Sequence, residues 1–176
     1  MNISCVIVTR GNVDMTDILA SLPFDDVVVW NNSVRDDIGI YGRFAAIAEA
    51  KHDIIYTQDD DVLVTGLDEL LASYEPGIVS INYDEPWDIP WISKGAVFDR
   101  HLPEIAFRRY WAKYDYDAYF RDEACDGIFA LLSEVKVANY GFIDLPHAYA
   151  QGRVSTTPGW YDDRRPEIQR RCASLL

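Results

Sequence analysis

The chain has 176 residues, 49% of them hydrophobic, which is enough for one core and predicts a single domain. Its net charge of −13 makes binding to bulk nucleic acid or to an anionic membrane unfavourable unless a local basic patch intervenes. No apolar stretch is long enough to span a membrane, the first residues lack the features of a signal peptide, and the three cysteines lack zinc spacing, so we expect a reduced, cytoplasmic chain.

Strand-like and helix-like segments alternate along the first half of the chain. The predicted strands cover residues 3–9, 27–30, 54–59 and 78–82, with further short strands at 95–98 and 138–145. The predicted helices cover residues 15–22, 43–50, 67–73, 102–112 and 126–135, with Asp126 as the N-cap of the last, and a short basic helix follows near the C-terminus. This alternation predicts an α/β fold with a mostly parallel sheet flanked by helices.

Three consecutive aspartates, Asp59, Asp60 and Asp61, lie between the apolar runs 54–58 and 62–64. Strands disfavour Asp, and two like charges about 4 Å apart repel by about 1 kcal/mol in water and about 4 kcal/mol at an effective dielectric constant of 20. A divalent cation would turn this repulsion into binding, and carboxylates suit Mg²⁺ or Mn²⁺ that also contacts substrate phosphates. The structural alternative is a solvated acidic turn, which the flanking apolar residues disfavour.

Polar residues follow three of the predicted strands. The three polar segments are Arg10-Gly11-Asn12, Asn31-Asn32-Ser33 and Asp59-Asp60-Asp61. Because ligands of parallel sheets gather at the carboxyl ends of the strands, we expect these segments to converge on one crevice.

A series of segments in a fixed order identifies a family resemblance. They are the strand 3–9, Val27-Val28-Val29-Trp30-Asn31-Asn32, Gly42-Arg43-Phe44, Asp59-Asp60-Asp61, Gly95-Ala96-Val97-Phe98, Cys125-Asp126-Gly127-Ile128 and His147. This order resembles the nucleotide-sugar glycosyltransferases of GT-A fold, and most closely the exostosin-like C-terminal transferase domain. The resemblance implies one Rossmann-like GT-A domain, with a nucleotide-binding half at 1–82, an acceptor half at 83–150 and a flexible C-terminal tail or lid at 151–176.

The resemblance also implies roles for the aspartate triplet and for residues around it. In this family the first Asp contacts the ribose and the last binds the metal, which implies Asp59 for ribose and Asp61, joined by His147, for Mn²⁺ or Mg²⁺. Asp60 is placed with the cofactor-binding residues, with a purely structural role as the alternative. The other implied cofactor-binding residues are Thr9, Arg10 and Asn12 at the base, Asn31 at the base or ribose, and Arg43 and Arg153 at the phosphates or donor sugar.

Asp126 and Arg43 are the predicted catalytic residues. In inverting members of this fold, an acid at the position of Asp126 takes the proton from the acceptor hydroxyl. The exostosin-like group usually carries Cys-Glu-Asp there, whereas this chain has Cys125-Asp126-Gly127, so the inverting or retaining outcome stays open. The alternatives are a plain N-cap role for Asp126, a surface position for Arg43, and Asp122 or Glu123 as the acid.

Aromatic residues supply further candidates in the second half of the chain. Trp87 and Trp91 lie in a proline-containing loop and could stack on an acceptor sugar, although a core position is the alternative. Trp160 and Tyr161, with Arg153, would form a lid over the diphosphate that excludes water, and the alternative is a plain C-terminal loop.

The expected function is therefore metal-dependent transfer of a hexosyl or N-acetylhexosaminyl group from a nucleoside diphosphate sugar, with a UDP-sugar favoured, to an acceptor hydroxyl. The acceptor could be a glycan, a small molecule, a protein or a modified nucleobase. One alternative is a nucleotidyltransferase, for which Arg10-Gly11-Asn12 is a short phosphate loop. The other is a non-catalytic nucleotide-sugar or carbohydrate-binding module.

Overall fold

The computed structural model describes residues 1–83, 89–146 and 163–176. Five of the predicted functional residues lie outside these ranges, so their roles stay predictions. They are Trp87, His147, Arg153, Trp160 and Tyr161.

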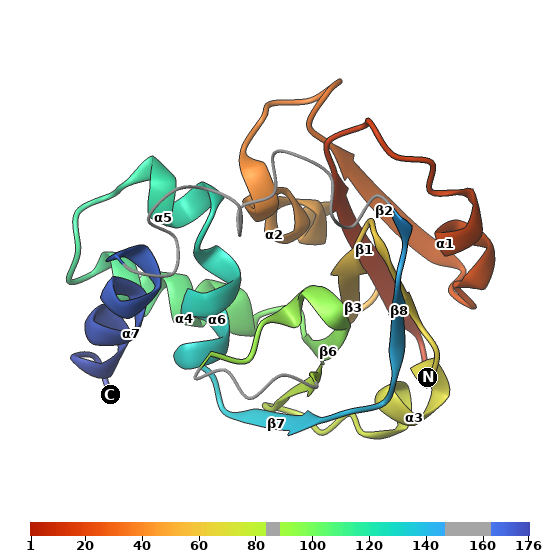
Figure 1. Cartoon of the computed structure of the whole chain (residues 1–176). Helices are drawn as coiled ribbons and strands as arrows, with labels where there is room; N and C mark the ends of the chain where they lie inside the picture. The colour runs from red at the N-terminus through yellow and green to blue at the C-terminus, as the bar shows by residue number, and fades with distance from the viewer. Residues whose placement is uncertain (84–88, 147–162) are drawn as a thin grey trace.

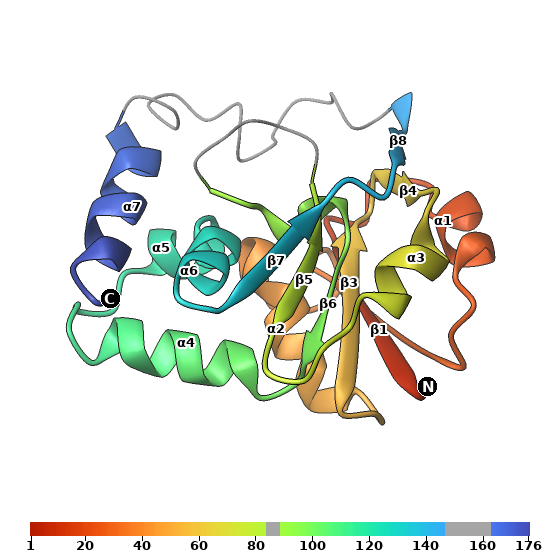
Figure 2. The same cartoon turned by 90° about the horizontal axis from the view of Figure 1, so that it is seen from below.

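Within the described residues, a six-stranded sheet forms the centre of the molecule, in the order β2-β1-β3-β6-β5-β7 (Figures 1 and 2). The strands are β1 (Ile3–Thr9), β2 (Asp26–Asn31), β3 (Ile54–Asp59), β5 (Val79–Asn82), β6 (Ala96–Asp99) and β7 (Val135–Ala138). β6 runs antiparallel to both of its neighbours, and the other pairings are parallel. The predicted α/β fold with a mostly parallel sheet is confirmed. β4 (Val62–Val64) and β8 (Phe142–Asp144) form a separate antiparallel pair beside it.

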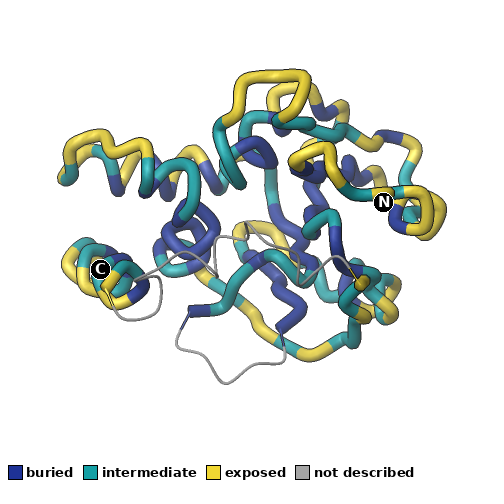
Figure 3. Tube along the Cα trace, turned by 45° about the horizontal axis from the view of Figure 1, so that its top comes forward, coloured by how far each residue is buried: buried dark blue, intermediate teal, exposed yellow. Residues whose placement is uncertain are grey.

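The central strands are buried along most of their length because helices cover both faces of the sheet. All seven residues of β1 are buried. Val6 and Ile55 belong to one hydrophobic cluster, while Ile7 and Tyr56, their neighbours along β1 and β3, belong to another on the opposite face. The buried stretches of the chain are drawn in dark blue in Figure 3.

Helices on the two sides of the sheet fill these two clusters (Figure 1). One side carries α2 (Gly42–Ala46), α4 (Leu102–Trp111), α5 (Ala118–Asp122), α6 (Cys125–Leu131) and α7 (Arg165–Ala173), and the other carries α1 (Thr16–Ser21) and α3 (Leu67–Ala72). Short 3₁₀ helices cover Gly39–Tyr41, Ile47–Glu49 and Ile92–Lys94. Phe44 of α2 contacts Phe107 and Phe129 edge to face, with ring centroids 4.9 and 5.5 Å apart. These contacts join α2, α4 and α6 into one packed layer.

The predicted helix 126–135 and the predicted strand 138–145 are shorter in the structure. The helix is present as α6, from Cys125 to Leu131, but the predicted N-cap role of Asp126 is wrong, because the cap residue is Ala124. The side chain of Asp126 faces Arg43 at 3.5 Å and does not cap the helix. The predicted strand 138–145 is reduced to β8, because Gly141 turns the chain with φ +85°.

The C-terminal helix α7 packs onto the main core. Its Ile168 and Cys172 are buried within the cluster that α6 also fills. The predicted basic helix near the C-terminus is therefore present, and it is a packed element.

The structure bears in two ways on the expected cellular setting. No helix within the described ranges is long and apolar enough to cross a membrane. The three cysteines, Cys5, Cys125 and Cys172, are buried free thiols.

A hydrogen-bonded carboxylate ties the beginnings of three strands together. The Oδ2 atom of Asp26 accepts hydrogen bonds from Ser4 Oγ at 2.5 Å and from the Lys51 backbone N–H at 2.8 Å. Ser4 Oγ in turn accepts the His52 backbone N–H at 3.0 Å. The Lys51 backbone hydrogen bond, followed by that of Ser4, lowers the pKa of Asp26 below its ordinary value.

This pKa shift predicts the pH dependence of an Asp26→Asn variant. A carboxylate with a lowered folded-state pKa contributes stability above the unfolded-state value near 4, and loses it as pH falls through the folded value. We expect D26N to lower the free energy of unfolding by about 1–3 kcal/mol at pH 7, and the loss to shrink below about pH 4. Denaturant unfolding at both pH values measures this.

The neighbouring Asp25 provides a matched control, since its side chain is 79% exposed. Asp25→Asn should change stability by less than about 0.5 kcal/mol. Equal losses of unfolding free energy in the two variants would contradict the role of Asp26 in joining the beginnings of the three strands.

Candidate functional site

The ends of three parallel strands meet at one edge of the sheet. In the β1–β2 ladder Thr9 is paired with Asn31, and in the β1–β3 ladder Val8 is paired with Asp59. Thr9, Asn31 and Asp59 therefore lie within about one residue of the same level at the carboxyl edge. The polar residues that end these strands are brought together as predicted.

The loop after β1 closes against the end of β2. Gly11 has φ +78°, and its N–H donates to Thr9 Oγ1 at 3.0 Å. A Cβ atom on Gly11 would lie 2.5 Å from Asn31 Oδ1, so only glycine fits this approach. Arg10 and Asn12 on either side of it are exposed and can reach a ligand at this edge.

A second close approach positions α2. A Cβ atom on Gly42 would lie 2.4 Å from Trp30 Cδ1 and 2.8 Å from Val8 Cγ2. The helix backbone therefore lies directly on β1 and β2, and Arg43, the next residue, is directed toward the end of β3.

Among the residues that the structure describes, Arg43 is the largest fully buried side chain, with 1% of it exposed. Its Nη2 donates a hydrogen bond to Asp59 Oδ1, and its Nε lies 3.5 Å from Asp126 Oδ1. A surface position for Arg43 is therefore excluded. Removing one partner from a buried ion pair typically costs about 3–5 kcal/mol, so this cluster constrains the fold around it.

Burial and charge act on the two inner groups in opposite ways. Desolvation is the largest effect on Asp126 and raises its pKa to about 7, with Asp59 adding to the rise and Arg43 opposing it. Desolvation opposes the charge on Arg43, but the carboxylates of Asp126 and Asp59 outweigh it and raise the pKa of the guanidinium. Arg43 stays charged, and Asp126 can exchange a proton near neutral pH.

The aspartate triplet lies where β3 turns into β4. Asp59 is 25% exposed, and Asp61 is buried in the turn, where its backbone oxygen accepts the Leu145 N–H at 2.8 Å. The side chain of Gln58 spans the turn by donating to the Val62 backbone oxygen at 2.5 Å. In the part of the chain that the structure describes, no three His, Cys, Asp or Glu side chains gather as a metal site. Mg²⁺ and Mn²⁺ often take only one or two carboxylates, with phosphate and water oxygens completing the shell, so the metal role of Asp61 stays a prediction.

Sequence reasoning missed an ion pair next to the triplet. Lys94 Nζ contacts the carboxylate of Asp144, and it lies 4.1 Å from the centroid of the Phe142 ring. In the β4–β8 ladder, Asp144 is paired with Val62, the residue that directly follows Asp61. Lys94 and Asp144 are 50 positions apart in the sequence, so no local sequence pattern could have predicted their contact.

The buried side chain of Asn82 fixes the segments around this pair. Its Nδ2 donates to the backbone oxygens of Lys94 at 2.8 Å and Gly141 at 3.2 Å, and its Oδ1 accepts the Tyr140 N–H at 2.8 Å. This residue holds the 3₁₀ helix of Lys94 against the connection between β7 and β8.

The remaining candidates within the described residues are Trp91, Asp122 and Glu123. Trp91 is partly buried, and its ring atoms lie 2.9 Å from where a Cβ on Gly127 would sit, so it packs on the first turn of α6 beside Asp126. The alternative acids are engaged elsewhere, Asp122 with Arg121 and Glu123 with Arg164.

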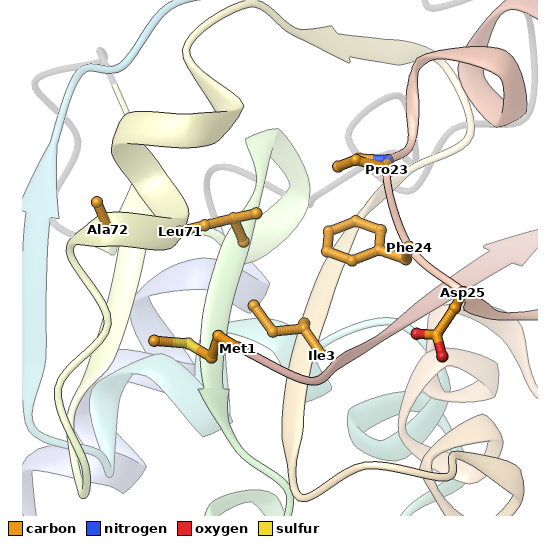
Figure 4. A pocket seen from close by; sticks show the side chains of 7 residues that line it. All are labelled: Met1, Ile3, Pro23, Phe24, Asp25, Leu71 and Ala72. Atoms are coloured by element: carbon orange, nitrogen blue, oxygen red, sulfur yellow. The ribbon is translucent and has the colours of Figure 1, made fainter.

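A hollow of about 330 Å³ lies at the opposite, amino edge of the sheet (Figure 4). Its lining is mostly apolar, and the residues that form it are Met1, Ile3, Pro23, Phe24, Asp25, Leu71 and Ala72. Ile3 begins β1 and Asp25 precedes β2, so this hollow is at the far end of the strands from Asp59. Asp25 carries the one charged side chain in this lining, so the hollow lacks the set of carboxylates and phosphate-binding groups that the predicted chemistry needs.

No protein-family model matches the chain, and no curated protein sequence matches it. Among solved structures, the chain is similar to the bifunctional IspDF from Campylobacter jejuni, at 12% sequence identity and a TM-score of 0.49. The similar region covers 79% of this chain and 50% of that chain. At so low a likeness, the function has to be inferred from this chain's own residues.

The raised pKa of Asp126 predicts how an Asp126→Asn variant responds to pH. A group with a raised folded-state pKa contributes stability below its unfolded value near 4, and this contribution is lost as pH rises through about 7. Asp126→Asn removes this titration, so we expect the stability of D126N relative to the native chain to rise between pH 4 and pH 8, from an offset at pH 4 that includes the loss of its contact with Arg43.

Denaturant unfolding between pH 4 and 8 measures this difference, and the exposed Asp115 is the control. Asp115→Asn should show an offset that does not change with pH. A loss of stability in D126N that grows with pH would contradict the raised pKa.

Proposed function

We propose that this chain is a metal-dependent glycosyltransferase that moves a sugar from a nucleoside diphosphate sugar to an acceptor hydroxyl. The observation that carries the proposal is the alignment of Thr9, Asn31 and Asp59 at the carboxyl edge of three parallel strands, followed by the turn of Asp60 and Asp61. This edge is where sheets of this kind bind nucleotides, and the turn adds the oxygen ligands that a divalent cation needs.

The donor would lie along this edge. Thr9, Arg10 and Asn12 would line the base, and Asn31 and Asp59 would contact base or ribose, since they end the two strands that flank β1. Asp61, with His147 from outside the described residues, would hold Mn²⁺ or Mg²⁺. Asp60, in the same turn, would contact the donor. Arg153, which also lies outside the described residues, would contact phosphate. When bound, the cation would neutralise the charge that develops on the leaving nucleoside diphosphate.

Asp126 would act on the acceptor side of the site. A general base works best when its pKa is near the working pH, and burial raises the pKa of Asp126 to about 7. Because 3% of its side chain is exposed, Asp126 would accept the proton of the acceptor hydroxyl, as that oxygen attacks the anomeric carbon, only once the acceptor displaces the residues that cover it. Trp91, packed on the same turn of α6, would contact an acceptor ring.

Arg43 takes a different role from the donor contact that the family resemblance implies. With 1% of its side chain exposed, it meets no ligand that arrives from solvent in this arrangement. It would instead hold the carboxylates of Asp59 and Asp126, one on each side of the reaction.

Metal-dependent binding of a nucleoside diphosphate is the first prediction of this proposal. Calorimetric titration with UDP, GDP and other diphosphates should show one that binds more tightly with Mn²⁺ than without it. Asp61→Asn should reduce this gain by about tenfold or more, because it removes a charged ligand of the cation. Asp53→Asn is the matched control, since Asp53 precedes the other end of β3 and is 92% exposed.

If no diphosphate gains affinity from metal, or if D61N binds as the native chain does, the metal site is excluded. The preferred diphosphate also names the base of the donor.

Turnover separates the three classes of function. With Mn²⁺ and the matching nucleoside diphosphate sugar, we expect slow release of free nucleoside diphosphate, which an acceptor accelerates. Consumption of a nucleoside triphosphate with release of pyrophosphate would instead identify a nucleotidyltransferase. Tight binding of the sugar nucleotide with no product of either kind would identify a binding module.

A further inference from the structure

We propose that Arg43 is a positioning residue that couples Asp59 to Asp126, so that a ligand bound at Asp59 changes the hydrogen bonding of Asp126. The inference rests on the proposed function in taking Asp59 as the group that meets the ligand. It adds a physical link between the donor side and the acceptor side of the site.

The contacts of the guanidinium are unequal. Its Nη2 is hydrogen-bonded to Asp59, whereas its Nε lies 3.5 Å from Asp126 Oδ1, beyond the usual range of about 2.7–3.2 Å for an N–H···O bond. Among the described residues, Nε and Nη1 of Arg43 and Oδ1 of Asp126 have no hydrogen-bond partner. A movement of about 0.5 Å would therefore give Asp126 a hydrogen bond that it lacks here.

Exposure decides which of the three groups a ligand can reach. The Asp59 side chain is 25% exposed, while those of Arg43 and Asp126 are 1% and 3% exposed. A ligand at the carboxyl edge meets Asp59 first, and its effect reaches Asp126 through the guanidinium between them.

Close contacts fix the backbone of the two helices that carry Arg43 and Asp126, so the Arg43 side chain is the part that can move. Gly42 seats the start of α2 directly on Trp30 and Val8, and Gly127 seats the first turn of α6 on Trp91. With both helices fixed, a change in the hydrogen bonding of Asp59 is taken up by the guanidinium. The guanidinium is a rigid fork whose Nη2 is held by Asp59 in a position that leaves Nε 3.5 Å from Asp126, so releasing Nη2 lets the fork move toward Asp126.

The test observes the Arg43 Nε–H group by NMR in ¹⁵N-labelled protein, assigned through bonds. In Asp59→Asn, we expect this resonance to move downfield and its exchange with water to slow, because Nε–H then donates to Asp126. The change should be absent from the double variant D59N/D126N, and Asp53→Asn should leave the resonance unchanged. Asp59→Ser gives the same test if D59N does not fold.

The native chain is then titrated with Mg²⁺ and the diphosphate identified by calorimetry, and the same movement of the resonance is expected. If D59N leaves the Nε–H resonance where it is, the coupling is overturned, whether or not any nucleotide binds. If the diphosphate binds with metal and the resonance does not move, the coupling is overturned while the proposed function stands. If no diphosphate binds, the proposed function fails, and the D59N comparison alone decides whether Arg43 can shift between the two carboxylates.

Discussion

The buried guanidinium of Arg43 is the constraint around which the site is arranged. It lies between Asp59, at the end of a central strand, and Asp126, on a helix from the second half of the chain. A charge in this position is costly to bury, and it is tolerated because two carboxylates surround it. Burial raises the pKa of Asp126 to about 7 despite its cationic neighbour, and the charge of Asp59 adds to the rise.

The fold makes this arrangement possible through two close backbone contacts. Gly42 lets α2 lie directly on the ends of β1 and β2, which brings Arg43 within reach of β3. The aromatic contacts of Phe44 with Phe107 and Phe129 then hold α2 against α4 and α6, so the helix that carries Asp126 packs against the helix that carries Arg43. The same packing that stabilises the core thus sets the distance between the acidic groups, and the two halves of the chain form one site.

The sequence predicted the fold class and the edge of the sheet that carries the polar groups, because both depend on local patterns. Continuous apolar runs mark strands covered on both faces, and polar residues at their ends mark the carboxyl edge. The burial of Arg43 and the pairing of Lys94 with Asp144 depend on contacts between distant residues, so no local pattern encodes them. Asp126 shows the limit most clearly, since an acid at a helix start predicts a cap, yet its carboxylate faces a buried arginine from another helix. The antiparallel direction of β6 was likewise not readable from its own apolar residues.

We propose that a cation and a nucleoside diphosphate bind together at the carboxyl edge of the sheet, beside Asp61. Anomalous diffraction from crystals grown with Mn²⁺ and UDP, or the diphosphate that binds best, tests it most directly. We expect a manganese peak within about 2.2 Å of an Asp61 carboxylate oxygen and beside the phosphates of the nucleotide. We expect the ribose to lie near Asp59. A nucleotide held without metal at this edge, or bound in the apolar hollow between Ile3 and Phe24, would contradict it.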